Sequence, residues 1–334
     1  MDRRRLLTGS VAAGLSIATP TLSRAQAPVT LRFASATLND VQHEYQKRFK
    51  DRVEARSGGR VTVQIFPASQ LGPIPSMVDG VTLGTIDAFI TATSFLGQID
   101  PRFQVFDVAG LFGDGERTRQ ILADAELRRR AFEFGAARGI QSVALFLHSP
   151  NAILARRPIR SLEDMRGLKI RTLGTPLQIE PMKRIGAIPV PMALSEVMPS
   201  LQTGAIDAVI SSSTVVSAFR YYDVAKQLTI VPTWPLIVTV AVNRRFLSRL
   251  PEDLRAIVLA GAAAAEADAI AWGRTDIEQA GQRWTQNGGE LTTASPAFLR
   301  ELQEQFTQAT THLMAASEAL RTEVMFVRGL AQRV

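Results

Sequence analysis

One arginine, Arg171, stands at the end of a short predicted strand, where its side chain could hold an acid group. The residues before it alternate between charged and apolar types, and residues 176–184 can form a helix after it. In an open α/β sheet, residues just past the carboxyl end of a strand face the ligand crevice. A guanidinium there offers a planar pair of donors that matches a carboxylate in two hydrogen bonds. The alternative is a surface or interdomain salt bridge, since most arginines are solvated.

Other polar and aromatic side chains follow predicted strands or lie in extended loops. Ser211 and Ser212 follow one strand of the second half, and Thr91 follows one of the first half. Their hydroxyl groups suit hydrogen bonds to a polar ligand, although ordinary turn and capping chemistry explains them equally well. Trp234 lies in a Pro-Thr-Trp-Pro segment that we expect to be an extended loop between lobes, where it could wall a cleft together with Phe95.

The sequence does not contain the usual motifs of a metal centre or a hydrolase. His43, His148 and His312 are far apart, and no pair has the spacing of a helical metal site. Residues 211–213 lack a Gly-x-Ser-x-Gly turn, and no histidine and acid are placed to activate these serines. The chain has no cysteine. We therefore expect no metal, no cofactor and no catalysis, while His148 stays open between lining a cleft and a structural role.

The first 27 residues have the three parts of a secretory signal. Residues 3–5 are basic, residues 6–19 form a short apolar region, and Ala25-Gln26-Ala27 is a cleavage site of the small-x-small type. The apolar region is too short and too interrupted to span a bilayer. We expect cleavage after Ala27 and a periplasmic mature protein, with export by the twin-arginine or the general secretory route left open.

The remaining chain reads as two similar α/β units. The net charge of +7 falls to +4 without residues 1–27, and this modest positive field suits small anions, whereas scattered basic residues and few aromatics argue against nucleic-acid binding. Alternating strands and helices indicate parallel sheets with right-handed crossovers, and the motifs at residues 83–88 and 202–208 are nearly the same. We expect a signal at 1–27, lobe I at 28–148 with about 238–276 returning to it, and lobe II at 149–237 with the helical part 277–334 packing on it.

These motifs resemble a known family, the extracytoplasmic substrate-binding proteins of TRAP transporters, of the DctP type. The resemblance spans about residues 30–260 in the family's order. It rests on FPASQLG at 66–72, LGTID at 83–87, DMRGLKIR at 164–171, GA at 186–187, PMA at 191–193, SEV at 195–197, LQTGAID at 201–207, NRRF at 243–246 and LPEDL at 250–254.

The resemblance implies a two-lobe periplasmic binding protein fold, in which each lobe is a mixed, mostly parallel sheet flanked by helices and the ligand cleft lies between the lobes. It implies that Arg171 forms the salt bridge to a ligand carboxylate and that Leu173 belongs to the same contact set. Asn151 stands where the family often has a second arginine, and Ser211 where it often has an asparagine. Residues 108–112 also depart from the family's preferred Leu-Pro-Phe-Leu-Phe.

The implied partners are a small organic acid and the membrane subunits of a TRAP permease. The departures leave open whether the ligand is a keto acid, a dicarboxylate or an aromatic acid, and the oligomeric state is also open. Two other classes remain. A binding protein of an ABC transporter or of a sensor would share the fold and differ in its partner. An exported enzyme with similar lobes is disfavoured by the missing nucleophile and base.

Overall fold

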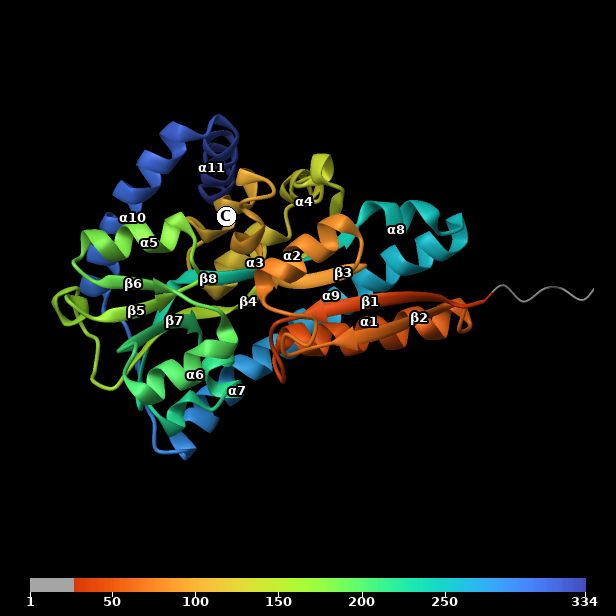
Figure 1. The fold of residues 1–334 in the computed structure, drawn as a ribbon. Helices are drawn as coiled ribbons and strands as arrows, with labels where there is room; N and C mark the ends of the chain where they lie inside the picture. Colours follow the sequence, from red (N-terminus) through yellow and green to blue (C-terminus); the bar gives the residue numbers. More distant parts are fainter. Residues whose placement is uncertain (1–26) are drawn as a thin grey trace, which may run out of the picture.

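The computed structural model describes residues 27–334, so nearly all of the predicted signal lies outside the described residues (Figure 1). Nine strands in this range form one sheet in the order β2-β1-β3-β8-β4-β7-β5-β6, and β9 pairs with β8. The strands are β1 Val29–Ser35, β2 Val61–Phe66, β3 Ala88–Ala92, β4 Ile140–Ala155, β5 Lys169–Thr172, β6 Ile188–Pro191, β7 Ala208–Ser212, β8 Gln227–Asn243 and β9 Glu290–Thr293.

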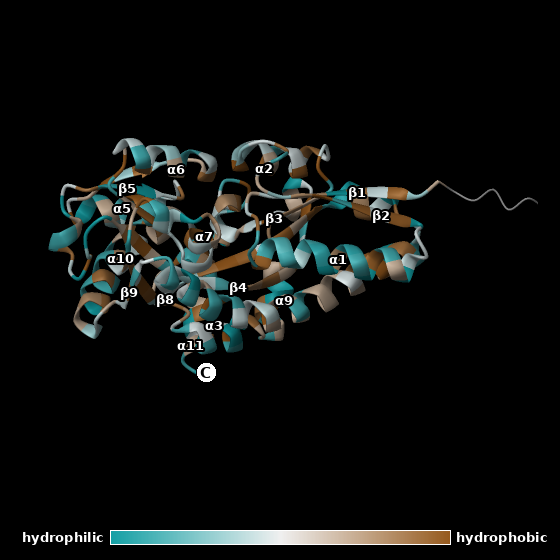
Figure 2. Ribbon diagram, turned by 90° about the horizontal axis from the view of Figure 1, so that it is seen from below, coloured by the Kyte–Doolittle hydropathy of each residue, from teal (hydrophilic) through white to brown (hydrophobic). Residues whose placement is uncertain are grey.

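Helices cover both faces of this sheet, and they mix hydrophilic and hydrophobic residues, whereas the central strand β4 is mostly hydrophobic (Figure 2). The helices are α1 Val41–Ser57, α2 Ile74–Leu83, α3 Gly115–Leu122, α4 Ala125–Ala131, α5 Pro176–Arg184, α6 Leu194–Thr203, α7 Ser213–Ala218, α8 Arg244–Arg249, α9 Glu252–Gln286, α10 Pro296–Ala316 and α11 Glu318–Ala331. The short 3-10 helix η2 spans Pro101–Asp107. None of these described helices is long and apolar enough to cross a membrane.

Helix α1 shows how the local sequence sets the bounds of an element. The Asp40 carboxylate accepts hydrogen bonds from the first backbone N–H groups of the helix, and Gly58, with φ of 61°, ends it in the left-handed conformation. Tyr45, Phe49 and Val53 lie on its buried face, as their spacing of four residues predicts. This helix therefore packs its apolar stripe onto the sheet and places its first turn at the carboxyl end of β1.

Two long antiparallel strands, β4 and β8, run through the whole sheet. The last part of β8 pairs with β3 on one side and with the first part of β4 on the other, whereas the last part of β4 pairs with β7 and the first part of β8 pairs with β9. The sequence pattern predicts separate apolar strands at 142–147 and 152–155, where the structure has β4, and an extended loop at 232–235. Both predictions were wrong, because Pro150 and Pro235 pair with each other and interrupt the ladder only locally, at register shifts beside Pro150.

The division of the chain into two lobes, joined by the paired strands β4 and β8, remains our proposal. Helix α9 contacts α1 on one side and α7 on the other, so it runs along both halves of the sheet (Figure 1). We expected residues 277–334 to pack on lobe II, and α10 does contact α5 there. Helix α11, however, packs on η2 and α3, with Val324 and Val327 in the same apolar cluster as Phe103 and Phe106. We therefore assign α11 to lobe I.

Candidate functional site

Five of the eight predicted contact residues line one cavity between the two halves of the sheet. They are Arg171, Leu173, Ser211, Thr91 and Phe95. Thr91 lies near the carboxyl end of β3 in lobe I, and Arg171 and Ser211 lie near the carboxyl ends of β5 and β7 in lobe II. The cavity thus forms where the strand ends of both halves meet, which is where open α/β sheets place their ligands.

Arg171 is held by backbone carbonyl groups, not by an acid. Its Nε and Nη2 donate to the Met192 carbonyl oxygen at 3.3 and 3.2 Å, and its Nη1 donates to the Ile210 carbonyl oxygen at 3.3 Å. The side chain is 1% exposed, and no carboxylate of the described residues forms an ion pair with it. A guanidinium has five N–H donors, so two remain, one on each Nη. The two carbonyl oxygens thus fix the position of the Arg171 guanidinium and leave its positive charge without a counter-ion among the described residues.

Burial lowers the pKa of Arg171 to about 10, which still leaves the group protonated at neutral pH. Tyr221 lies close enough to interact with it, but burial raises the pKa of this phenol to about 12, so Tyr221 supplies no negative charge at pH 7. A cation without a counter-ion in a dry site favours the binding of an anion, because the anion would relieve the cost of burying the charge.

The sheet register places Ser211 beside Arg171. Arg171 pairs with Val209 across β5 and β7, and side chains two residues apart on a strand share a face. Ser211 therefore lies on the same face of the sheet as Arg171, next to the carboxyl end of β7. No hydrogen bond within residues 27–334 uses its hydroxyl group, which leaves that group free for a ligand.

Asn151 and Ser212 lie on the opposite face of the sheet, where they pair across β4 and β7. The hydroxyl of Ser212 accepts a hydrogen bond from the backbone N–H of Val215 at 3.2 Å, so it caps α7, as the capping interpretation predicted. Both amide atoms of Asn151 are buried without a hydrogen-bond partner among the described residues. Unpaired buried amides are rare in folded proteins, and this one lies in register with Ser212, at the carboxyl end of β7.

Trp234 does not lie among the residues that line the cavity. It is 1% exposed and packs edge to face on Phe306 of α10, with ring centroids 4.5 Å apart. The prediction of a cleft wall rested on a loop at this segment. Because the segment is part of β8, strand alternation turns the indole toward the lobe II core formed by Ile153, Ile170 and other apolar residues.

Several cavity residues were missed at the level of sequence. The most informative is Gln42, in the first turn of α1, whose side chain lines the cavity and makes no hydrogen bond within the described chain. Thr37 and Leu236 line it as well. The signal that could have found Gln42 is its place directly after β1, since the loops following parallel strands gather at one edge of the sheet.

His148, which the sequence left open, has a structural role between the lobes. Its Nε2 lies 2.9 Å from Oδ2 of Asp40, and its Nδ1 lies 3.2 Å from the hydroxyl oxygen of Thr214. Asp40 precedes α1 in lobe I, Thr214 belongs to α7 in lobe II, and all three side chains are buried. His148, which lies in β4, therefore connects the start of α1 in lobe I with α7 in lobe II.

A second contact between the lobes involves Asp107, a fully buried carboxylate without a basic partner in the described chain. It accepts hydrogen bonds from the Thr175 hydroxyl at 2.9 Å and from Gln178 Nε2 at 3.5 Å, both at the start of α5. Gln178 Oε1 in turn accepts from the backbone N–H of Leu173 at 2.9 Å. These bonds hold the loop that follows Arg171. Burial outweighs the hydrogen bonds and raises the pKa of Asp107 to about 6.

The raised pKa of Asp107 predicts a specific dependence of stability on pH. A carboxyl whose folded pKa exceeds its unfolded value stabilises the fold at low pH, and this contribution is lost as the pH rises through about 6. The free energy of unfolding of the wild type relative to Asp107→Asn should therefore fall by about 2 to 3 kcal/mol between pH 4 and pH 7. Urea unfolding at several pH values measures this difference. A difference that stays constant would contradict the assignment, and Asp79→Asn, at an exposed position of α2, is the control.

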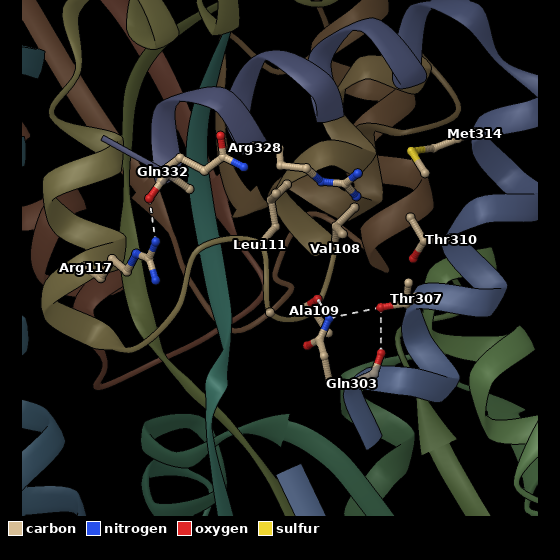
Figure 3. Close-up of a pocket in the computed structure, with 12 residues that line it drawn as sticks. Val108, Ala109, Leu111, Arg117, Gln303, Thr307, Thr310, Met314, Arg328 and Gln332 are labelled. Atoms are coloured by element: carbon tan, nitrogen blue, oxygen red, sulfur yellow. Dashed lines mark hydrogen bonds between the residues drawn. The ribbon is translucent and has the colours of Figure 1, made fainter. Parts of the chain in front are cut away.

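A larger pocket lies away from the strand ends, between α10, α11 and the segment after η2 (Figure 3). Gln303 there donates to the Ala109 carbonyl oxygen at 2.7 Å, and Arg117 donates to the Ala331 carbonyl oxygen. The first contact attaches α10 to the segment after η2, and the second attaches α11 to α3. In the described part of the chain, no group of three or more histidine, aspartate and glutamate side chains could hold a metal ion.

The sequence of this chain is similar to those of known solute-binding proteins. The family model DctP, described as bacterial extracellular solute-binding protein, family 7, matches residues 33–317. Among curated relatives, the 2,3-diketo-L-gulonate-binding periplasmic protein YiaO of Escherichia coli is 30% identical over 232 residues, which are 69% of this chain and 70% of the relative. The C4-dicarboxylate-binding periplasmic protein DctP of Rhodobacter capsulatus is 26% identical over 251 residues, 75% of this chain and 74% of the relative.

The fold is similar to that of solved binding proteins. A TRAP periplasmic solute-binding protein from Desulfovibrio salexigens, solved with bound orotic acid, superposes with a TM-score of 0.86 at 21% identity, covering 91% of this chain and 99% of that chain. A second, from Shewanella oneidensis with bound succinate, gives a TM-score of 0.85 at 23% identity and covers 91% of this chain and 99% of that chain. These superpositions confirm the predicted fold class.

Proposed function

The chain belongs to family 7 of the bacterial extracellular solute-binding proteins, the DctP family, and on this premise we propose that it captures a small organic acid through a salt bridge to Arg171. The family consists of solute-binding proteins and not of enzymes, so the function is binding. This bears out the resemblance that the sequence motifs indicated. The acid would then be delivered to a TRAP-type permease in the membrane.

The observation that carries the proposal is the uncompensated charge of Arg171. The guanidinium is buried at the meeting point of the strand ends, its position is set by two carbonyl oxygens, and two of its donors remain unused. A carboxylate accepts two parallel N–H bonds from such a fork. The relatives named above bind acids according to their names, 2,3-diketo-L-gulonate in one case and C4-dicarboxylates in the other.

Asn151 does not line the cavity around Arg171, but we propose it as a second polar contact for the ligand. Its amide is buried and unpaired, and it can donate to a ligand oxygen or accept from a ligand hydroxyl without adding a charge. We therefore keep Asn151 as a proposed contact. A ligand that contacts residues of both lobes would favour the closed arrangement of the lobes only through those contacts.

The location and partner follow from the same premise. The predicted signal in residues 1–27 would direct the mature chain to the periplasm, and the curated relatives YiaO and DctP are named as periplasmic proteins. The permease is part of the proposal because the solved structures of similar fold are named as TRAP periplasmic solute-binding proteins.

Thermal unfolding of the mature protein with a panel of organic acids tests the proposed function. A ligand that binds only the folded state raises Tm in a concentration-dependent way. At a ligand concentration one hundred times Kd, the free energy of unfolding rises by about 2.7 kcal/mol. We expect at least one acid to do so and to be recovered unchanged. Failure of every acid to raise Tm, or conversion of the bound acid into another compound, would overturn the proposal.

A further inference from the structure

The walls of the cavity around Arg171 are mostly apolar. Eight of its thirteen lining residues have apolar side chains. Those from lobe I and from β8 are Ala36, Ile74, Ala92, Phe95 and Leu236. Lobe II adds Leu173, Leu194 and Val215 around the guanidinium. A ligand that fills this space places most of its surface against hydrocarbon, where burial of apolar groups is favourable and burial of unpaired polar groups is costly.

The cavity can satisfy only a few neutral oxygens. Its neutral polar side chains are Thr37, Gln42, Thr91 and Ser211. The hydroxyl of Thr37 already donates to Asp40 at 2.9 Å. The other three make no hydrogen bond within the described chain. Ser211 lies beside the guanidinium, so it is placed for an oxygen on the carbon next to the carboxylate, whereas Gln42 and Thr91 face it from lobe I.

The charges of the cavity match one carboxylate and nothing more. Arg171 is its single basic residue, and no aspartate or glutamate is among the residues that line it. A second carboxylate on the ligand would be desolvated without a cation, since Arg171 is the one basic residue that lines the cavity. An ammonium group would be desolvated without an anion. Asp40, which accepts a hydrogen bond from the lining residue Thr37, is buried and also uses its oxygens for His148 and the backbone of α1.

Resting on the proposed function, we infer that the ligand is a monocarboxylate with a mainly apolar body and few neutral oxygens. A 2-oxo or 2-hydroxy acid with an alkyl or aryl chain meets this description. Sugar acids carry more hydroxyl groups than the three free polar side chains of the cavity can pair. A dicarboxylate would find no second cation in the cavity, and an amino acid would find no anion for its ammonium group. Specificity then arises from the groups that are left unpaired when the wrong acid binds.

Four acids with the same six-carbon chain separate these classes. They are hexanoate, adipate with a second carboxylate, gluconate with five hydroxyl groups, and 6-aminohexanoate with an ammonium group. Isothermal titration of the mature protein should show hexanoate binding at least about tenfold more tightly than each of the other three. The acid 2-oxohexanoate should bind as tightly as hexanoate or more tightly, because Ser211 is free to bond its oxo group.

A variant of the cavity wall gives an independent readout. Phe95 is half-buried and lines the cavity, so Phe95→Ala removes apolar contact area without emptying the core. We expect this change to weaken hexanoate by about tenfold and to leave gluconate unchanged. Phe132→Ala is the matched control, because this half-buried ring lies beside Arg128 outside the cavity.

The outcomes distinguish the inference from the function on which it rests. Tightest binding of hexanoate or 2-oxohexanoate, with selective loss in Phe95→Ala, supports both. Tightest binding of adipate, gluconate or 6-aminohexanoate overturns the inference and leaves the proposed function in place. Equal loss of hexanoate and gluconate affinity in Phe95→Ala also overturns the inference. Absence of binding by every acid, here and in the wider panel, overturns the proposed function itself.

Discussion

Arg171→Met is expected to weaken binding of the cognate acid by roughly two to four decades, about 3 to 5 kcal/mol. The substitution removes the only cation of the cavity, so the carboxylate would lose its partners after it has lost its water. Arg171→Lys keeps the charge and loses the planar fork, and its affinity should lie between those of the wild type and the methionine variant. Isothermal titration with the acid found in the Tm panel measures all three.

The stability of the ligand-free variant separates a binding role from a structural one. The wild type buries an uncompensated guanidinium, so Arg171→Met should unfold at the same or a higher urea concentration. Arg166→Met, an exposed position in the same lobe, is the matched control and should leave both affinity and stability unchanged. Unchanged affinity in Arg171→Met would contradict the assigned role, and a large loss of stability would assign Arg171 to the fold.

Asp40→Ala is expected to destabilise the protein by about 3 to 5 kcal/mol, the largest effect on folding in this account. The carboxylate accepts from the Thr37 hydroxyl, from the N–H groups of Gln42 and His43, and it lies 2.9 Å from His148 Nε2. Its removal ends the cap of α1 and leaves buried donors unpaired. Asp51→Ala, on the exposed side of α1, is the control for urea unfolding.

The effect of Asp40 should depend on pH in the opposite sense to that of Asp107. Burial raises the pKa of Asp40, but hydrogen bonds from His148, Thr37 and the backbone of His43 outweigh burial and hold the pKa below its usual range. Its stabilising contribution is therefore present above an unfolded pKa near 3.8 and is lost as the pH falls further, through the folded pKa. A deficit of Asp40→Ala that does not shrink in this acid range would contradict the assignment.

The sequence predicted the parts of the site that depend on strand ends. Arg171, Ser211 and Thr91 follow or end short strands, and parallel topology alone brings such residues to one edge of a sheet. Phe95, expected as an aromatic wall of the cleft, and Leu173, expected in the contact set of Arg171, line the same cavity. Gln42 was missed because it lies in a helical pattern, where a polar residue reads as solvent-facing, although the first turn of α1 opens onto the same edge.

The errors arose where long-range pairing overrides local signals. The segment around Trp234 contains two prolines and reads as a loop, but pairing with β4 keeps it extended as part of β8 and turns the indole into the core. The lobe assignment of α11 depended on where the chain turns at Ser317, which ends α10 and caps α11. A sequence pattern gives the amphipathic face of such a helix and does not say which lobe covers it.

A crystal structure of the mature protein with its bound acid tests the central claim most directly. The account predicts that both carboxylate oxygens lie within hydrogen-bond distance of the two free donors on Nη1 and Nη2 of Arg171, with apolar residues of both lobes around the rest of the ligand. A carboxylate held at any other group, with Arg171 bonded to the carbonyl oxygens of Met192 and Ile210 alone, would contradict it.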